Sequence, residues 1–378
     1  MSGSFSWFNL LTVLATAFAV SVLLTPMVRG IATRYRMGDK PNGRRAHIRM
    51  IPHLGGVAIV AGVLVPLALW GDFSAASAAS VVDGVLVGAV PAIAIIVLLG
   101  LIDDVKSLRA MHKLVVQIVA AAILVGAGFV LHVDGTAAVS VGALVLSFIF
   151  FIGMPSAVNV IDGHDGLAGG MVLISALAFA LIANAIGFGL IVTASLSLVG
   201  ACLGFLVFNF PPGTIYMGDT GSMFLGTMLA LVACSLSMFA PSLHVFFAVC
   251  LVLGIPALDA ILAIVRRVIL RSPVFLADSL HMHHVLQQAG FSPRQVLAIL
   301  LPVQLLLCAL GVAAAFGVTL ALIVGALVLA TAFIWFLRQM VAARYVGGRL
   351  SPDISSGSIP LRGDRAVELS AHHRSVGR

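Results

Sequence analysis

The chain has 378 residues, of which 61% are hydrophobic and only 9% are charged, whereas about a quarter of the residues in soluble domains are charged. Together with a mean hydropathy of +1.16, this composition excludes a water-soluble fold and predicts an integral membrane protein. The 21 Lys and Arg residues outnumber the 14 Asp and Glu residues and give a net charge of +7. The charges are few enough to be placed one by one.

Five apolar stretches can each hold one helix of about 20 residues, the length that crosses the hydrocarbon core of a bilayer. They are Met1–Arg29, Met50–Gly71, Gly84–Ile102, Leu114–Val133 and Gly135–Ile161. Leu, Ala, Val and Ile dominate without the alternating pattern of a membrane barrel, so we expect helices. The first stretch has no small-residue cleavage site to close it, so we interpret it as an anchor rather than a signal peptide.

Three longer apolar stretches are each about two helices long, namely Gly166–Gly218, Thr220–Leu258 and Gln295–Phe336. Turn-forming residues stand near the middle of each stretch, at Gly187 and Gly189, at Pro241 and at Gly317. The sequence therefore predicts an all-α integral membrane protein with about eleven transmembrane helices.

The basic residues predict the orientation of these helices. All Lys and Arg residues fall within residues 29–49, 106–113, 266–294 and 338–378. With eleven helices, an even number of crossings separates these segments, so all of them lie on the same side of the membrane. The positive-inside rule makes that side cytoplasmic, which places the N-terminus outside and the C-terminus in the cytoplasm.

We predict two regions in the chain. Residues 1–345 are expected to form one polytopic transmembrane domain whose catalytic loops lie on the cytoplasmic side. Residues 346–378, rich in Ser, Gly and Arg, are expected to form a disordered basic tail that touches the headgroups of membrane lipids.

Five polar clusters fall on the predicted cytoplasmic side, and the first begins at Asp39. Arg44 and His47 follow among turn-forming residues, and cations in such a loop suit the binding of a phosphate group. An ordinary basic loop of a membrane protein is the alternative interpretation.

The second cluster consists of Asp103 and Asp104 at the end of the third predicted span, with Lys113 behind them. Two adjacent carboxylates at a membrane boundary repel each other unless a cation or a proton accompanies them. We interpret the pair as functional, and a solvated helix end is the alternative.

The third cluster contains Asn159, Asp162 and Asp165, which recur every three residues. One helical turn or a tight loop would present all three side chains to one side. Because no Lys or Arg stands nearby, a divalent cation carried in with a substrate is the expected counter-charge. A calcium loop is the competing interpretation, but the spacing lacks the closing Glu of an EF-hand.

The fourth cluster is built around Asp219, which stands between glycines where a helix is expected to start. Asp219 is the only charged residue between Asp165 and Asp259. We therefore favour a role in binding a metal ion over the alternative, which is a simple helix cap.

The fifth cluster follows Asp259 and consists of Arg266, Arg267, His281, His283 and His284. Arg and His side chains together suit a site that binds a diphosphate, as donors and as partial counter-charge. Zinc is the alternative, although the histidine spacing matches no zincin helix.

Several acids, many cations and a membrane-embedded frame indicate phosphoryl or phospho-sugar transfer with a lipid substrate. Mg²⁺ is the expected cofactor, with Mn²⁺ as the alternative ion, because Mg²⁺ combines one or two carboxylates with phosphate oxygens and water. A secondary transporter is the rival class, but transporters place ionisable groups near the bilayer midplane and have repeated halves.

From Asp39 to Arg294, the order and spacing of the five clusters resemble those of the polyprenyl-phosphate N-acetylhexosamine-1-phosphate transferases, also known as glycosyltransferase family 4. The resemblance implies eleven transmembrane helices and an active site facing the cytoplasm, in the cytoplasmic (inner) membrane of a bacterium. It implies Mg²⁺-dependent transfer of a sugar 1-phosphate from a UDP-N-acetylhexosamine to undecaprenyl phosphate, with release of UMP. A homodimer is compatible with this class, and no nucleic-acid partner is expected.

The resemblance also implies roles for individual residues. Asp103 and Asp104 match a pair of which one is thought to deprotonate or position the lipid phosphate, and Lys113 matches a lysine that contacts phosphate. Further matches associate Asn159 and Asp219 with Mg²⁺, Asp162 and Asp165 with the nucleotide and the metal, and His281, His283 and His284 with the diphosphate.

The His-x-His-His pattern at residues 281–284 resembles the GlcNAc-1-phosphate branch more than the phospho-MurNAc-pentapeptide branch, whose signature usually has three consecutive histidines. Ser156 and His164 depart from the family pattern, which often has Asn and an aliphatic residue there. The departures leave every carboxylate in place. GlcNAc-1-phosphate is the expected group, and another UDP-N-acetylhexosamine donor or the muramyl-pentapeptide donor is the alternative.

Overall fold

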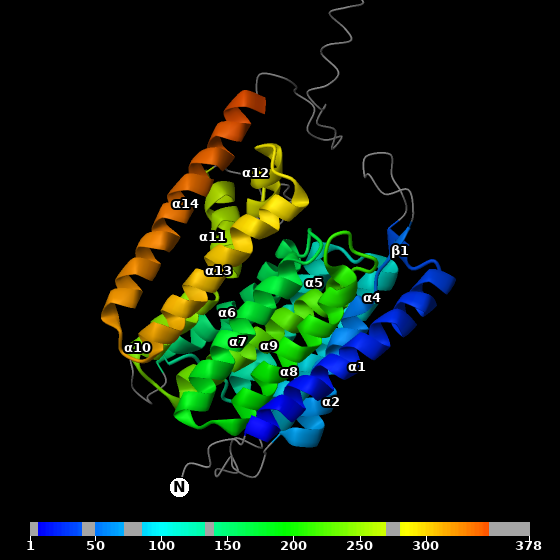
Figure 1. Cartoon of the computed structure of the whole chain (residues 1–378). Coiled ribbons are helices and arrows are strands. Elements are labelled where there is room, and N and C mark those ends of the chain that lie inside the picture. The colour runs from blue at the N-terminus through cyan, green and yellow to red at the C-terminus, as the bar shows by residue number, and fades with distance from the viewer. Residues whose placement is uncertain (1–6, 40–49, 72–84, 133–139, 270–279, 348–378) are drawn as a thin grey trace, which may run out of the picture.

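The structure, a computed structural model, describes residues 7–39, 50–71, 85–132, 140–269 and 280–347 (Figure 1). The first half of the described chain contains α1 (Trp7–Arg34), α2 (Gly55–Trp70), the π-helix η1 (Val85–Ala89), α4 (Val90–Lys106), α5 (Ala110–Gly126), α6 (Val141–Ile161) and α7 (Leu167–Ile186). The second half contains α8 (Gly189–Asn209), α9 (Gly218–Phe239), α10 (Leu243–Val252), α11 (Gly254–Ile269), α12 (Met282–Gln288), α13 (Pro293–Ala315) and α14 (Thr319–Gly347). The short strands β1 (Gly38–Asp39) and β2 (Ile51–Pro52) pair antiparallel, with Gly38 opposite Pro52.

The prediction of an all-α, multi-pass membrane protein is confirmed. Within the described ranges, eight helices are long and apolar enough to cross a membrane, and α10 and α11 together form a ninth candidate that is bent by 76°. The two shorter apolar helices α2 and α5 lie in the second and fourth predicted spans. The number of crossings and the sides on which the termini lie stay predictions.

The predicted breaks within the long apolar stretches coincide with helix ends. Gly187 ends α7 in the left-handed region with φ +80°, and Gly317 separates α13 from α14 with φ +85°. Pro241 lies between α9 and α10. These turns bring consecutive apolar helices back against each other, which forms the bundle.

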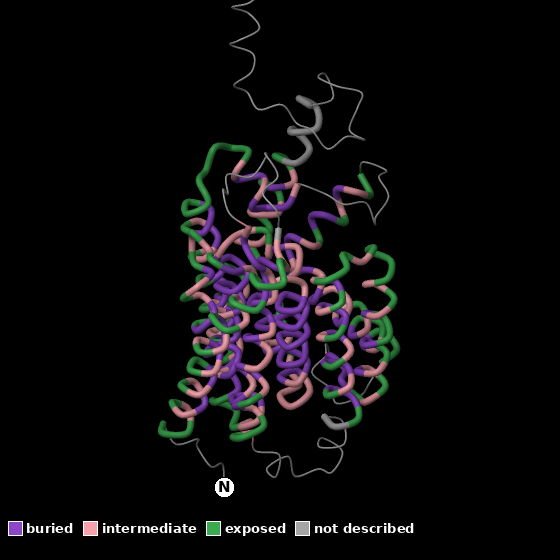
Figure 2. Tube along the Cα trace, turned by 90° about the vertical axis from the view of Figure 1, so that its right-hand side faces the viewer, coloured by how far each residue is buried: buried purple, intermediate pink, exposed green. Residues whose placement is uncertain are grey.

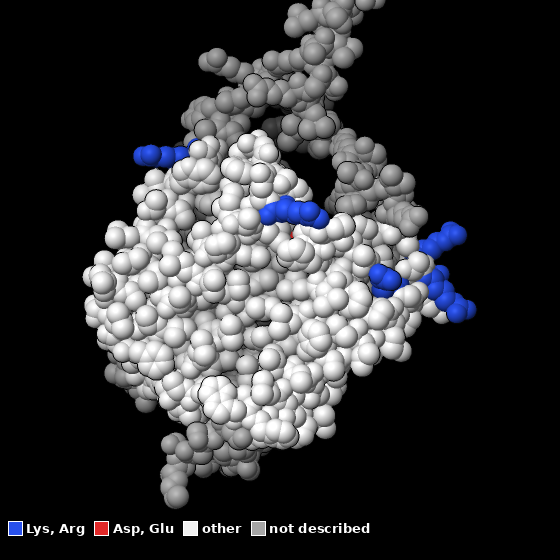
Figure 3. All heavy atoms as spheres, viewed as in Figure 1, with Lys and Arg blue, Asp and Glu red and all other residues white. Residues whose placement is uncertain are grey.

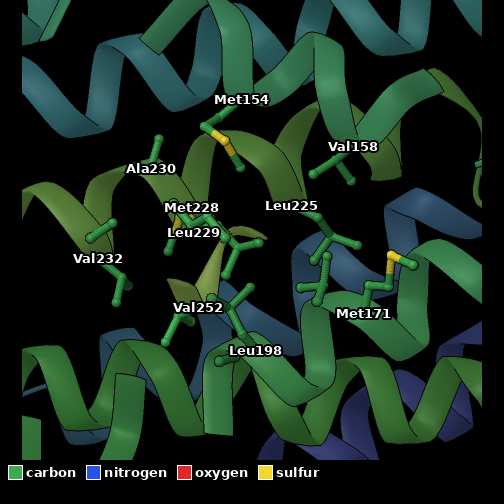
Figure 4. Close-up of a cluster of buried hydrophobic side chains, with 14 of the residues drawn as sticks. Met154, Val158, Met171, Leu198, Leu225, Met228, Leu229, Ala230, Val232 and Val252 are labelled. Carbon is green, nitrogen blue, oxygen red and sulfur yellow. The ribbon is translucent and has the colours of Figure 1, made fainter. Parts of the chain in front are cut away.

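Helix α9 is the centre of the bundle. In its most apolar 18-residue window, 83% of the residues are buried, against 17% in α14 and 22% in α1. Figure 4 shows Leu225 and Leu229 of α9 between Met154 of α6 and Leu198 of α8. Helices α1 and α14 lie at opposite edges of the molecule (Figure 1), and Figure 2 shows exposed residues mainly on its outside. Exposed apolar side chains of both helices, such as Trp7 and Leu320, suit contact with lipid.

Glycines allow the backbones of α2 and α4 to contact the backbone at the start of α9 directly. A Cβ atom on Gly56 would lie 2.2 Å from the backbone nitrogen of Gly221, and a Cβ on Gly100 would lie 2.4 Å from Cα of Thr220. Both distances are below any possible contact. Only glycine fits at positions 56 and 100 without moving these helices.

The polar clusters gather at one end of the molecule. Strand β1, the end of α4 and helix α12 all lie at the end opposite to the start of α1 (Figure 1). In Figure 3 the visible Lys and Arg side chains also lie towards that end, and the rest of this face is apolar or uncharged. This grouping is what the four basic segments of the sequence predict.

Candidate active site

Asp104, at the end of α4, binds the N-terminus of α9. Its Oδ1 accepts a hydrogen bond of 2.7 Å from the backbone N–H of Asp219. Its Oδ2 accepts bonds of 3.2 Å from the N–H and 2.6 Å from the hydroxyl of Thr220. The first amides of a helix have no acceptor within the helix, so this carboxylate supplies the missing one. Asp104 thereby positions Asp219, and its proposed catalytic role stays a prediction.

The backbone of Gly218 makes this cap possible. Gly218 adopts φ +69°, which favours glycine, and a Cβ atom there would lie 2.5 Å from Oδ1 of Asp104. A larger residue would push the carboxylate away from the helix start. The close contact between α4 and α9 therefore requires glycine beside Asp219.

Lys113 bridges Asp103 and Asp219. Its Nζ lies 2.6 Å from Oδ2 of Asp103 and also forms an ion pair with Oδ2 of Asp219. Oδ1 of Asp103 accepts a hydrogen bond of 2.6 Å from the backbone N–H of Leu108. A left-handed turn at Ser107, with φ +51°, reverses the chain between α4 and α5 and brings Lys113 back to the two carboxylates.

Asn159 joins the same group from α6. Its Nδ2 donates a hydrogen bond of 3.4 Å to Oδ2 of Asp219, and its Oδ1 accepts one of 2.8 Å from the hydroxyl of Ser222. The structure thus brings together the two predicted metal-binding residues. Ser222 was not predicted as a site residue, although it stands one helical turn after Asp219.

Asp162 and Asp165 lie in the loop that follows α6. Burial, followed by the negative charges of Asp219, Asp104 and Asp165, raises the pKa of Asp162 well above its usual range. Oδ2 of Asp165 accepts a hydrogen bond of 2.8 Å from the backbone N–H of Gly213. The carboxylates are therefore close enough to repel each other, and the loop binds the segment that leads into α9.

A buried amide, Asn209, holds this loop in place and was not predicted. Its Oδ1 accepts a hydrogen bond of 2.8 Å from the N–H of Gly166, and its Nδ2 donates one of 2.9 Å to the carbonyl of Ile215. Gly166 itself has φ +75°. The only sequence signal for Asn209 is its place just before two prolines, where a helix must end.

These residues fit a divalent cation only in combination with a substrate. Oδ2 atoms of Asp103 and Asp219 converge on one positive centre, the ammonium group of Lys113. Within the described ranges, no three His, Cys, Asp or Glu side chains are grouped so that they could hold a metal ion by themselves. One or two carboxylates, an amide oxygen, phosphate oxygens and water are the ligand set that Mg²⁺ takes in proteins.

The histidine motif is attached to α11 by two buried groups. Asp259 accepts a hydrogen bond of 2.8 Å from the N–H of Met282, and its Oδ2 lies 3.0 Å from Nδ1 of His281. Nη1 of Arg266 donates a bond of 2.5 Å to the carbonyl of Leu280. Arg266 is 2% exposed, so it positions the motif, and binding of substrate by Arg266 or by the half-buried Arg267 stays a prediction.

His283 faces the loop after α6. It is 2% exposed, and its Nε2 has no hydrogen-bond partner among the residues that the structure describes. A Cβ atom on Gly163 would lie 2.6 Å from this nitrogen. Burial, and then the neighbouring His284, His164 and His281, lower the pKa of His283. This lowered pKa favours the neutral imidazole in the absence of substrate, and the binding of a diphosphate by His281, His283 and His284 stays a prediction.

His284 and His164 complete this contact. Burial lowers the pKa of His284, whose ring centroid lies 4.1 Å from that of His283. His164, one of the two departures from the family pattern, lies with its Nε2 2.7 Å from Nε2 of Gln287 in α12. The third and fifth clusters of the sequence thus meet through their histidines.

Ser156, the other departure from the family pattern, links two helices. Its hydroxyl donates a hydrogen bond of 3.2 Å to Oε1 of the buried Gln117 in α5. It also lies 3.1 Å from the carbonyl of Ile152 in its own helix. The replacement at Ser156 therefore changes a link between α5 and α6, one turn away from Asn159.

The first cluster is described only in part. Asp39 lies in β1, opposite Ile51, and Arg44 and His47 lie outside the described residues. The segment after β2 binds the start of α9, because the N–H groups of Gly55 and Gly56 donate bonds of 2.9 and 2.8 Å to the carbonyls of Tyr216 and Met217. The segment after β2 is thus adjacent to the start of α9, and the binding of substrate by the first cluster stays a prediction.

The fold and the site define a helical, multi-pass membrane protein with an acid-rich polar site at one end of the bundle. The model of glycosyl transferase family 4 matches residues 86–237, which include α4 and most of α9. The chain belongs to this family, and the predicted resemblance is confirmed.

Three similar proteins each align with about three quarters or more of this chain. The "probable undecaprenyl-phosphate N-acetylglucosaminyl 1-phosphate transferase" of Bacillus subtilis is 33% identical over 293 residues, which cover 74% of this chain and 79% of that protein. The decaprenyl-phosphate N-acetylglucosaminephosphotransferase of Mycobacterium tuberculosis H37Rv is 34% identical over 75% of this chain and 77% of its own. The phospho-N-acetylmuramoyl-pentapeptide-transferase of Desulforudis audaxviator is 33% identical over 79% of this chain and 95% of its own.

Proposed function

We propose that the protein transfers N-acetylglucosamine 1-phosphate from UDP-N-acetylglucosamine to undecaprenyl phosphate, releases UMP and thereby starts a lipid-linked glycan of the cell envelope. The observation that carries the proposal is that the carboxylates of Asp103 and Asp219 both bind the ammonium group of Lys113. This contact lies at the end of the helix bundle where other carboxylates gather. Relatives named as GlcNAc-1-phosphate transferases of polyprenyl phosphates support the reaction.

The proposed reaction is an in-line displacement. An oxygen of the lipid phosphate attacks the β-phosphorus of the UDP-sugar, the bond between the β-phosphorus and the bridging oxygen breaks, and UMP leaves with the electron pair. A lipid phosphate is largely ionised at neutral pH, so Asp103 is needed to orient the nucleophile more than to deprotonate it. A two-step route through an aspartyl phosphate is the alternative.

Lys113 is the group that we propose to receive the phosphate. In the structure its ammonium group is shared by two carboxylates, so an entering phosphate would compete with them for the same charge. The Nε2 of His283 has no partner within the described part of the chain, and the lowered pKa of His283 favours a neutral ring. Such a nitrogen can donate or accept one hydrogen bond beside the Asp162 loop. Such fixed groups stabilise charge that develops on a leaving phosphate.

We propose Mg²⁺ as the cofactor, with Mn²⁺ as the alternative ion, held by Asp219 and Asn159 together with phosphate oxygens and water. When bound, the cation would neutralise charge on the diphosphate. The proximity of the Asn159 amide to the Asp219 carboxylate supports this assignment. Because Nδ2 faces Asp219 and Oδ1 faces Ser222, the amide would turn over to bind the cation through its oxygen.

The proposed location is the cytoplasmic (inner) membrane of a bacterium, with the site facing the cytoplasm. The gathering of basic residues at the site end supports this orientation through the positive-inside rule (Figure 3). Reactivity of single cysteines placed at Tyr35 and at Phe188, at opposite ends of the bundle, towards a membrane-impermeant thiol reagent tests it in intact cells.

The reaction is tested with purified protein in detergent, undecaprenyl phosphate, Mg²⁺ and UDP-GlcNAc that carries a radiolabel in the sugar. We expect label in the extracted lipid and an equal amount of UMP. Parallel reactions with UDP-GalNAc and UDP-MurNAc-pentapeptide test the alternative donors. A transporter, the rival class, would give no labelled lipid in detergent, because there is no vesicle lumen to fill.

A further inference from the structure

The bent pair of α10 and α11 leaves backbone groups without helical partners. The pair bends by 76° at Leu253, between the end of α10 and the start of α11. Pro256 has no N–H group, so the carbonyl of Val252, four residues earlier, loses its usual donor. The N–H of Ile255 lies in the first turn of α11 and has no acceptor within that helix.

Gln304, from the neighbouring helix α13, pairs with both freed groups. Its Nε2 donates a hydrogen bond of 2.7 Å to the carbonyl of Val252, and its Oε1 accepts one of 3.3 Å from the N–H of Ile255. Gln304 is completely buried. One side chain therefore closes the break from both sides, which matters because water is not there to do so in a bilayer.

Ser175, from α7, holds the same carbonyl and the same amide. Its hydroxyl donates a hydrogen bond of 3.0 Å to the carbonyl of Val252 and accepts one of 2.9 Å from Nε2 of Gln304. Ser175 is also completely buried. The break is thus tied to two neighbouring helices, α7 and α13.

The helix beyond the break carries the groups that place the histidine motif. Asp259 follows Ile255 by one turn of α11 and holds His281 and Met282, and Arg266 holds Leu280. Met282 and Leu286 of α12 are buried and also line an apolar cavity of about 640 Å³ between α12, α13 and α14, so the polar contacts with α11 add a direction that this apolar packing does not give. The direction of α11 therefore controls where His283 lies.

We propose that Gln304, supported by Ser175, is a positioning residue for the active site: it fixes the bend between α10 and α11 and so places the histidine motif against the Asp162 loop. The inference rests on the proposed function as far as turnover is concerned. The position of α12 can be measured without any reaction, so the two proposals can fail separately.

The test uses the full chain with spin labels at two exposed positions, Tyr35 at the end of α1 and Gln288 at the end of α12. Both are changed to cysteine in a Cys250→Ser background, because Cys250 is the exposed native cysteine and the other three are buried. Gln304→Met keeps the shape and removes both hydrogen bonds to the break, together with those to Ser175 and Cys308. Ser175→Ala removes only the hydroxyl, and Thr25→Val is the control, since the buried Thr25 hydroxyl bonds within its own helix.

We expect Gln304→Met to broaden or shift the distance distribution between the labels and, in the unlabelled protein, to lower kcat on the order of 10- to 100-fold with a smaller change in KM. Ser175→Ala should give the same changes to a smaller extent, roughly threefold in kcat. Thr25→Val should leave both measurements at the wild-type value.

A folded Gln304→Met protein with the wild-type distance distribution and kcat would overturn the proposal. If Gln304→Met does not fold, Ser175→Ala decides: an unchanged distribution rejects the proposal and a broadened one supports it. A wild-type protein that transfers no sugar phosphate counts against the proposed function alone, and the distance measurement still tests the role of Gln304.

Discussion

The two halves of the candidate site are held in place in different ways. Asp103, Asp104 and Asp219 lie where α4 meets α9, the most buried helix of the bundle, and backbone contacts fix that junction. The histidine motif lies on the seven-residue helix α12 beside an open cavity and depends on bonds from Asp259 and Arg266. The acidic half is placed by close backbone contacts, and the histidine half by polar contacts together with the buried apolar side chains of α12.

The largest effect is expected in the acidic half. Asp219→Ala removes the carboxylate that Lys113 and Asn159 share and that we assign to Mg²⁺. We expect UMP release to fall by roughly 10³-fold or more, with a thermal unfolding midpoint close to that of the wild type. Near-wild-type turnover in a Mg²⁺ titration of the purified variant would reject the metal assignment.

His283→Ala is expected to lower kcat by about 10²-fold, because it removes a buried nitrogen that faces the Asp162 loop. The matched control is His132→Ala, in the segment that follows α5 at the opposite end of the bundle, which should keep its activity. Added zinc should not restore turnover. Restoration by zinc would instead revive a metal-binding role for the histidines.

The contact between the halves can be tested at Gly163. Gly163→Ala introduces a Cβ atom that would lie 2.6 Å from Nε2 of His283, whereas Gly153→Ala in α6 has nothing within 4 Å and serves as the control. We expect about a tenfold loss of kcat from Gly163→Ala. In the background of His283→Ala the same change should cost almost nothing, and additive losses would mean that the two residues act independently.

The smallest effect concerns stability and pH. The raised pKa of Asp162 in the folded protein means that its ionised form destabilises the fold, so this cost grows as the pH rises from about 4 through the folded pKa. Asp162→Asn should therefore unfold at the same temperature as the wild type near pH 4 and at a higher temperature near pH 8. Equal midpoints at both pH values would contradict the crowding of carboxylates. The measurement needs no substrate.

The sequence predicts the helices well because the signal for a membrane span is local. Each predicted apolar stretch overlaps at least one described helix, and Gly187, Pro241 and Gly317 stand at or just beyond the ends of these helices. The bend at Leu253 was not predicted, although Pro256 is visible in the sequence. A proline can kink, break or start a helix, and here the choice depends on Gln304, 48 positions later.

The sequence predicts which residues gather at the site better than it predicts which of them contact each other. The acids and histidines could be grouped because the predicted topology puts them on one side of the membrane, and the structure brings Asp103, Asn159 and Asp219 together as expected. That Asp104 caps α9 depends on how α4 packs against that helix, which no local pattern encodes. Arg44 and His47 lie outside the described residues, so their roles stay predictions.

The glycine junction has a consequence for how this architecture can diversify. Three backbones, those of α2, α4 and α9, meet at positions 56, 100 and 221 with no room for a side chain. Neither polarity nor charge can be tuned there, because any added atom separates the helices that carry the carboxylates. New preferences for a donor sugar or a lipid must therefore arise in the loops and in α12, where exchange of a side chain does not move a helix.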